Sequence, residues 1–465
     1  MPTPKGDVLG TGRIGKLLFQ LAVPAITAQL VNVLYNMVDR MYIGRIPEVG
    51  ATALTGVGVS LPLIMVISAF ASLVGAGGAP LAAIEMGRQN PKKAEEIMGN
   101  SLVLLTVLGV VLTGVILAWG EQMLWWFGAS ADTIGYGADY MQIYACGTLF
   151  VQIALGMNMF ITTQGFAKMS MLTVLIGAVL NIVLDPVFIF ALDMGVRGAA
   201  LATILSQAVS AVWVLCFLFG KRTLLRLRGC NLRLRPSVLL PVVGLGVSPF
   251  IMQATESVIV ICFNASLQRY GGDVAVGAMT ILSSVMQFAM LPLQGLTQGA
   301  QPIVSYNYGA RNGPRVKQAF RLLLIAALSY TFLLWLLVML FPGMFSAIFT
   351  DDPGLTECAN WGLRIYMSAS CIFGAQIACQ QTFLALGNAR ASLFLAVLRK
   401  IVLLIPLIFI LPHFFADRVM AVFLAEPVAD TLAVATTVSM FLWQFRHTMR
   451  ELGGAEALPQ KGERV

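Results

Sequence analysis

The chain has 465 residues, of which 58% are hydrophobic and only 11% are charged. A soluble domain carries about 25% charged residues, so this composition excludes an ordinary soluble enzyme and a disordered regulator. The formal net charge of +8 would suit a nucleic-acid binder, but the positions of the charges along the chain argue against that function. The composition indicates a protein that crosses a membrane several times.

Apolar runs long enough to cross a bilayer recur along the whole chain. A spanning helix needs about 20 mostly apolar residues. Helices are expected rather than barrel strands, because the runs are long and do not alternate. No cleavable signal peptide is seen before the first run. Twelve spans are predicted, at residues 15–42, 53–84, 97–119, 136–164, 169–192, 196–219, 238–268, 274–306, 316–342, 359–386, 391–412 and 419–445.

The basic residues predict how these spans are oriented. If the N-terminus is cytoplasmic, most of the 30 lysine and arginine residues fall on cytoplasmic segments, as is typical of membrane proteins. Both termini are therefore expected in the cytoplasm. The same bias explains the net charge, because basic cytoplasmic loops face anionic lipid.

The chain also repeats itself at a constant offset of 222 positions. The repeated residues include Gly77 with Gly299, Pro80 with Pro302 and Gly87 with Gly309. This repeat predicts an N-lobe of six spans at 1–220, a basic cytoplasmic linker at 221–236, a C-lobe of six spans at 237–446 and a cytoplasmic tail at 447–465. Halves with six spans each share one orientation, so a central site between them and alternating access are expected.

Polar residues within the spans of the first half predict an ion or proton site. An acid in the middle of the membrane costs roughly 2.5–3.5 kcal/mol, so it needs a partner, a proton, an ion or water. The candidates are Gln29, Asn32, Asn36 and Asp39 of the first span, Asn181 and Asp185 of the fifth, and Thr203 and Gln207 of the sixth. The alternatives are a capped helix end at Asp39 and a structural Asp-Pro turn at Asp185.

The second half carries further polar candidates. Glu256 of the seventh span is a second carboxylate that could bind an ion or substrate. The glutamines Gln253, Gln287, Gln376 and Gln380 either line a wet cavity or join helices. Arg399 and Lys400 of the eleventh span are expected to pair with Glu426 and Asp430 of the twelfth, because buried charges are usually paired.

Several motifs occur in order between about residues 15 and 445. They are Leu21-Ala-Val-Pro24, Tyr35-Asn36…Asp39-Arg40, Asn181…Asp185-Pro186, Gly198-Ala-Ala-Leu-Ala-Thr203, Gln301-Pro302…Tyr306-Asn307-Tyr308-Gly309 and Glu426-Pro427…Asp430. In these motifs the chain resembles the multidrug and toxic compound extrusion (MATE) transporters, particularly bacterial multidrug exporters.

The resemblance implies twelve helices in two lobes around a central cavity, and exchange of H⁺ or Na⁺ for organic, often cationic, compounds. The family's N-lobe cation site falls on Asp39, Asn181, Asp185 and Thr203, which could hold Na⁺ or a proton. Glu256 matches one acid that some members use in the C-lobe. The tenth span offers only glutamines where a second acid is expected, which favours the N-lobe site.

The expected function is therefore an antiporter in the cell membrane that exports cationic, amphiphilic organic compounds, with H⁺ or Na⁺ as coupling ion and no cofactor. It is expected to act as a monomer among membrane lipids, without nucleic acid. One alternative is a flippase for lipid-linked saccharides, which would need an arginine-rich cavity for pyrophosphate. The other is a membrane enzyme, for which neither a nucleophile with a base nor metal ligands stand out.

Overall fold

The computed structural model describes residues 8–350 and 352–456, and this part of the chain is helical without strands. The elements of the first half are α1 (Val8–Thr11), α2 (Ile14–Gly44), α3 (Gly50–Gly87), α4 (Pro91–Trp126), α5 (Ile134–Thr163), α6 (Ala167–Pro186), the π-helix η2 (Val187–Ala191) and α7 (Gly195–Phe219). The elements that follow are η3 (Gly229–Asn231), α8 (Pro236–Gly309), α9 (Gly313–Leu340), α10 (Pro342–Ser346), α11 (Pro353–Tyr366), α12 (Ser370–Ala385), α13 (Ala389–Val397), the π-helix η4 (Leu398–Leu404), α14 (Ile405–Ile410), η5 (Leu411–His413) and α15 (Arg418–Glu456).

These helices confirm the predicted all-helical fold of twelve passes. Ten helical stretches in the described residues are long and apolar enough to cross a membrane. One of them, α8, makes two passes because its backbone leaves the helical conformation at Gly272, where φ is +62°, a conformation that glycine adopts readily. The α11–α12 pair supplies one more pass from two shorter helices.

The fifth and eleventh spans are less regular than predicted. α6 continues into the π-helix η2 directly after Pro186, and the eleventh span contains the π-helix η4 between α13 and α14. The last helix is longer than predicted, because α15 runs to Glu456 and buries Leu452 beside Gly313. The residue bounds of the two lobes and the tail stay a prediction.

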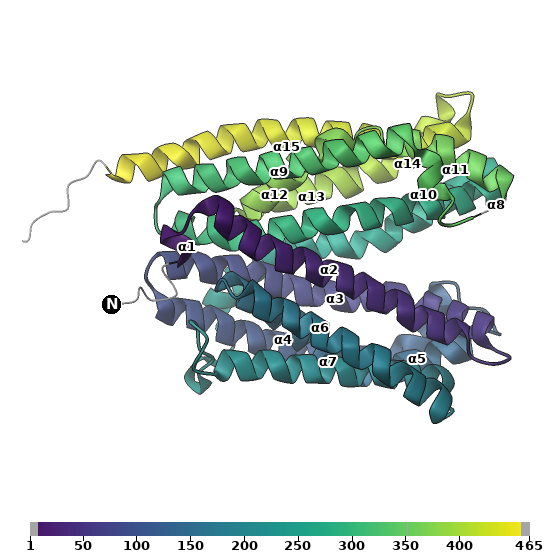
Figure 1. Ribbon diagram of the computed structural model, residues 1–465, viewed down its shortest axis with the longest axis horizontal. Coiled ribbons are helices and arrows are strands. Elements are labelled where there is room, and N and C mark those ends of the chain that lie inside the picture. Colours follow the sequence, from purple (N-terminus) through teal and green to yellow (C-terminus); the bar gives the residue numbers. More distant parts are fainter. Residues whose placement is uncertain (1–7, 351, 457–465) are drawn as a thin grey trace, which may run out of the picture.

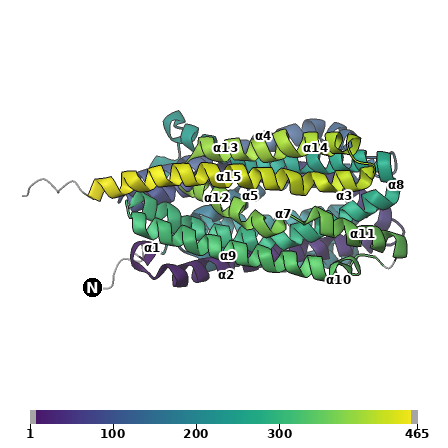
Figure 2. The same cartoon turned by 90° about the horizontal axis from the view of Figure 1, so that it is seen from above.

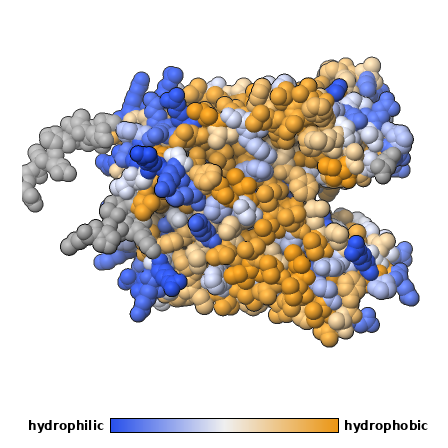
Figure 3. All heavy atoms as spheres, in the orientation of Figure 1, coloured by the Kyte–Doolittle hydropathy of each residue, from blue (hydrophilic) through white to orange (hydrophobic). Residues whose placement is uncertain are grey.

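The helices form two groups, with α2–α7 in one and α8–α15 in the other (Figure 1). Both described ends of the chain lie at the same end of the molecule, where α15 extends past the other helices (Figure 2). We call this the closed end. At the opposite end, where α8 turns at Gly272, the space-filling view shows a notch between the groups (Figure 3). We call it the open end.

The hydrophobic core follows this division. At the closed end one cluster of buried residues joins both halves, including Leu21 and Met86 with Val242 and Ile303. Elsewhere a second cluster draws only on residues after 258, and a third only on residues before 201. The halves therefore share a core at the closed end and have separate cores toward the open end.

Repeated glycines build the closed end. A Cβ atom on Gly87 would lie 2.0 Å from the carbonyl oxygen of Tyr306, and one on its repeat partner Gly309 would lie 2.0 Å from that of Ile84. Gly246, on the first arm of α8, touches α3 even more closely. Small residues let helix backbones approach in membrane proteins. The repeat therefore places matching close contacts on both sides of the interface between the halves.

The predicted linker at 221–236 is fixed to the first half by side chains. The Gln164 Oε1 atom accepts hydrogen bonds from the Thr223 hydroxyl at 2.7 Å and from the backbone N–H groups of Leu224 and Leu225 at 2.8 Å. Further along, the guanidinium of Arg228 pairs with Glu95 at 3.0 Å. This segment is consequently a structured part of the closed end.

The short helix α1 of the first half is held by the second half. The Arg315 guanidinium donates to the backbone oxygens of Leu9 at 3.1 Å and Gly12 at 2.7 Å, and to Asn307 Oδ1 at 2.9 Å. The Asn307 amide donates to the same Leu9 oxygen at 3.0 Å. These bonds add a polar connection between the halves at the closed end.

The glycine packing predicts different effects for two substitutions on the same helix. In Gly246→Ala the new Cβ would lie 1.7 Å from the Leu73 carbonyl oxygen, whereas Gly244→Ala places a Cβ with no atom within 4 Å. We expect Gly246→Ala to destabilise the fold by about 1–3 kcal/mol, the usual cost of overpacking. Gly244→Ala should be neutral or stabilise the helix by up to about 1 kcal/mol. Unfolding of the purified variants in detergent measures both, and equal effects would contradict the packing described.

Candidate functional site

Two carboxylates meet in the interior of the first half. Asp39 of α2 and Asp185 of α6 are 8% and 0% exposed, and their carboxyl groups interact with each other. The neighbouring Arg40 interacts electrostatically with Asp39, but among the described residues no lysine, arginine or histidine forms an ion pair with either carboxylate. The Asp39 Oδ1 and Asp185 Oδ2 atoms are buried without a hydrogen-bond partner. Buried oxygens of this kind are suited to receive a proton or a small cation.

The other two predicted site residues lie beside this pair. The Asn181 amide donates to Asp185 Oδ1 at 3.1 Å and to the Thr203 hydroxyl at 3.4 Å. Asn181 is 2% exposed, and its own Oδ1 atom has no partner. The structure thus brings Asp39, Asn181, Asp185 and Thr203 together from α2, α6 and α7, and leaves three buried oxygens among them unsatisfied.

Local backbone structure positions Asp185. The next residue, Pro186, ends α6, and the chain continues in the π-helix η2. Proline has no N–H to donate, and π-helical turns occur frequently at functional sites. Asp185 nevertheless stays completely buried, so the Asp-Pro turn does not direct its carboxyl group to the surface.

Tyrosines surround the carboxylate pair, and sequence analysis missed them as site residues. Tyr35 interacts electrostatically with both carboxylates, and Tyr140 interacts with Asp39 and Thr203. The Tyr140 ring stacks on that of Tyr144, with centroids 5.9 Å apart. The spacing of Tyr35 from Asp39, one helical turn, was a usable signal. Tyr140 lies on α5, and only the tertiary fold places it here.

The remaining polar candidates of the first half do not join the pair. The Asn36 amide donates to the Asn32 backbone oxygen at 2.6 Å, and Asn36 is exposed. Gln29 and Gln207 are partly buried, and in the described part of the chain neither hydrogen-bonds to the carboxylates. Their predicted role in lining a cavity stays a prediction.

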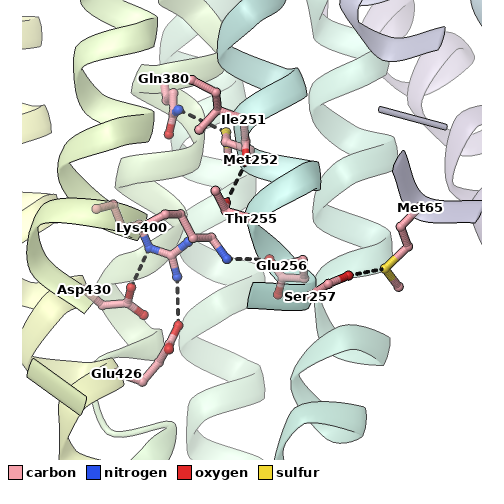
Figure 4. A network of polar contacts seen from close by, with 11 residues as sticks. Met65, Ile251, Met252, Thr255, Glu256, Ser257, Gln380, Lys400, Glu426 and Asp430 are labelled. Atoms are coloured by element: carbon pink, nitrogen blue, oxygen red, sulfur yellow. Dashed lines mark hydrogen bonds and ion pairs between the residues drawn. The ribbon is translucent and has the colours of Figure 1, made fainter. Parts of the chain in front are cut away.

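The second half contains a charge network of three acids and two bases, drawn in Figure 4. Arg399 donates to Asp430 at 2.7 Å and to Glu426 at 3.0 Å, and all three side chains are under a tenth exposed. The guanidinium also lies 4.5 Å from the centre of the Phe373 ring. The predicted pairing of the eleventh and twelfth spans is confirmed for Arg399.

Lys400 pairs differently from the prediction. Its ammonium lies 2.5 Å from Glu256 of α8, not against the acids of α15 (Figure 4). The physical reason is that consecutive helical residues point in different directions, so Arg399 and Lys400 face different neighbours. Glu256 thus has a basic partner that the sequence analysis did not foresee, and its predicted role in binding an ion or substrate stays a prediction. Unlike the other acids of the network, the Glu256 side chain is 51% exposed.

The predicted glutamines of the second half have different surroundings: two form hydrogen bonds, one is buried and one is exposed. Gln253 accepts a hydrogen bond from Ser72 of the first half at 3.0 Å, and Gln380 donates to the Met252 sulfur at 3.1 Å. Gln376 is buried with its Oε1 atom unpartnered, and Gln287 is exposed. Gln253 and Gln380 therefore join helices in this structure.

Comparisons with known proteins agree with this architecture. The MatE family model matches residues 24–187 and 249–410. The multidrug export protein MepA of Staphylococcus haemolyticus is 25% identical over 433 residues, 93% of each chain, and that of Staphylococcus aureus is 23% identical over 436 residues, 93% of this chain and 95% of the other. A crystal structure of MATE in the bent conformation superposes with a TM-score of 0.91, at 23% identity, over 97% of this chain and 100% of that one. An outward-facing multidrug resistance MATE transporter gives a TM-score of 0.89, at 23% identity, over 96% and 99%.

The charge network predicts unequal effects for its two bases. Arg399→Gln leaves two buried carboxylates unpaired and should destabilise the fold by about 3–5 kcal/mol. Lys400→Gln leaves the half-exposed Glu256, which water can solvate, and should cost about 1 kcal/mol or less. Unfolding of both variants in mixed detergent micelles measures the difference. Equal losses of unfolding free energy would contradict this prediction, because Lys400 would then contribute as much to stability as Arg399.

Proposed function

The chain belongs to the MatE family, and we propose on that premise that it is a secondary antiporter that exports small organic cations in exchange for H⁺ or Na⁺. Its relatives are named multidrug export proteins, and members of this family are transporters rather than enzymes. The single observation that carries the ion coupling is the pair of buried carboxylates, Asp39 and Asp185, neither of which forms an ion pair with a basic residue in the described part of the chain.

The coupling ion follows from the chemistry of the four-residue site. Two carboxylates in contact repel each other when both are charged, and burial increases the cost. A proton or Na⁺ removes that repulsion, and Na⁺ accepts the carboxylate, amide and hydroxyl oxygens that Asn181 and Thr203 add. We propose this ion as the only small species besides the substrate that the cycle requires, with no cofactor.

The substrate class follows from the charge on the second half. The network of Glu256, Glu426 and Asp430 with Arg399 and Lys400 contains three acids and two bases. Its formal charge of −1 favours organic cations and disfavours pyrophosphate. A flippase for lipid-linked saccharides is for this reason the weaker alternative, and lipid translocation without efflux of cations would favour it.

The proposed cycle uses the closed and open ends as two gates. With both termini in the cytoplasm of a cell-membrane monomer, the closed end is cytoplasmic and the open end faces outward, which fits the excess of basic residues on the predicted cytoplasmic segments. Ion binding at Asp39 and Asp185 neutralises the site, changes the packing of α2 against α6 and releases substrate outward. Ion release to the cytoplasm then resets the transporter.

Efflux of ethidium from energised vesicles tests this function. We expect Asp185→Asn and Asp39→Asn each to reduce gradient-driven efflux by at least about tenfold, because one charge moved through 100 mV supplies about 2.3 kcal/mol. Proton and sodium gradients imposed separately identify the coupling ion. Undiminished efflux by Asp185→Asn would remove that carboxylate from the mechanism.

A matched control separates coupling from general damage. Asp193→Asn changes an exposed acid just after the same span, at a position with φ of +52° that asparagine also tolerates. This variant should transport like the parent. If it loses efflux as fully as Asp185→Asn, the loss cannot be attributed to the carboxylate pair.

A further inference from the structure

The Glu256–Lys400 pair lies where the two halves begin to separate. Phe250 of α8 packs on Phe70 of the first half with ring centroids 4.9 Å apart, and the Ser257 hydroxyl contacts the Met65 sulfur at 3.6 Å (Figure 4). Farther along the same arm, the buried residue Phe263 belongs to a core made only of second-half residues. Glu256 therefore lies at the base of the space between the halves.

The two members of this pair have unequal access to that space. The Glu256 side chain is 51% exposed, whereas the Lys400 side chain is only 8% exposed. The carboxylate thus faces the gap while the ammonium approaches it from inside the second half. A positive group arriving in the gap can reach Glu256 without first moving Lys400.

Arg399 and Lys400 are held with unequal strength. Arg399 contacts two carboxylates and an aromatic ring. Lys400 has Glu256 as its one hydrogen-bonded partner in the described part of the chain. Both residues lie on the π-helix η4, a type of segment found frequently at functional sites. Of the two bases, Lys400 is the one that can give up its partner.

The network still offers Lys400 a negative neighbour after Lys400 has lost its contact with Glu256. It holds one more acid than base, and Lys400 interacts electrostatically with Glu426 as well as with Glu256. A buried cation without any counter-charge would cost several kcal/mol, but Lys400 would retain a negative neighbour after losing Glu256. Exchange of its partner is therefore energetically accessible.

We propose that Lys400 is a tethered competitor of the substrate: a monovalent organic cation entering between the halves replaces the Lys400 ammonium as the partner of Glu256. Lys400 then sets the affinity and the charge selectivity of transport. This inference rests on the proposed export of organic cations and assigns to Lys400 a specificity-determining role. Since its ammonium already neutralises Glu256, the second half needs no external coupling ion.

The test compares binding of tetraphenylphosphonium with binding of triphenylphosphine oxide, an uncharged compound of similar shape. Calorimetry on protein in lipid nanodiscs measures both affinities. Lys400→Gln should bind the phosphonium about tenfold more tightly, because a competing charge near Glu256 is worth roughly 1.4 kcal/mol or more. Glu256→Gln should bind it about tenfold more weakly, for the same reason. Affinity for the phosphine oxide should not change in either variant.

Phosphonium affinity should rise in Lys400→Gln and fall in Glu256→Gln, and these opposite changes distinguish competition from a structural role. If both substitutions weaken phosphonium binding, or both change the phosphine oxide equally, Lys400 only supports the fold and the proposal is overturned. Lys168→Gln, which removes an exposed lysine in the first turn of α6, is the matched control and should leave both affinities unchanged. Absence of saturable phosphonium binding by the parent protein would also overturn the proposal.

The double variant Glu256→Gln with Lys400→Gln guards against misfolding, because it keeps the net charge of the parent. Even if Lys400→Gln alone does not fold, the double variant should bind phosphonium more tightly than Glu256→Gln. An equal or weaker affinity would contradict the proposal. These binding experiments are independent of efflux, so a parent protein that binds the cation but does not export it would overturn the proposed function and leave this inference standing.

Discussion

A buried charge needs a counter-charge, and the two halves of this protein meet that requirement in different ways. The first half brings Asp39 and Asp185 together, and among the described residues no basic side chain forms an ion pair with either of them. The second half surrounds its acids with Arg399 and Lys400. Transfer of an isolated carboxylate into a medium of low dielectric constant is so costly that one partner must always be supplied. In the proposed transporter, the counter-charge of the first half comes from solution, whereas that of the second half is part of the chain.

This difference is built on a shared backbone plan. In both halves the fifth span departs from a regular α-helix through a π-helical segment, η2 after Asp185 and η4 around Arg399. In both halves glycines at equivalent positions bring the backbones together at the closed end. The two halves thus share the close glycine contacts and the helix irregularity, but they differ in the charged residues beside them. Under the proposed function, this difference would let one half respond to an ion and the other to a substrate.

The sequence predicted the fold well, because the signals for membrane spans are local. Apolar run length and the offset between Gly87 and Gly309 required no tertiary information. The N-lobe cation site was also predictable. Asn181 and Asp185 lie one helical turn apart, and the resemblance to the family indicated that Thr203 and Asp39 belong to the same site. Tyr140 was not predictable, because α5 carries no signal of its distance from Asp39.

The charge network was only partly predictable for a related reason. The position of Arg399 and Lys400 within a span indicated that each needs an acidic partner, but it did not determine which acid each would contact. That choice depends on the rotation of η4 about its own axis, which a π-helical segment alters. The structured segment after α7 was missed similarly, because a basic sequence predicts a cytoplasmic location and gives no sign that Gln164 will bind three of its groups.

The attachment of α1 to Arg315 and Asn307 has a consequence for the start of the chain. Those bonds join the α1 segment of one half to the other half. A rotation of the halves that separates the closed end must therefore either break the bonds from the donors Arg315 and Asn307 or move α1 together with the second half. The amino-terminal segment is thereby a natural reporter of gate position. A label attached there would sense the conformational state of the whole molecule, although it lies far from both carboxylates.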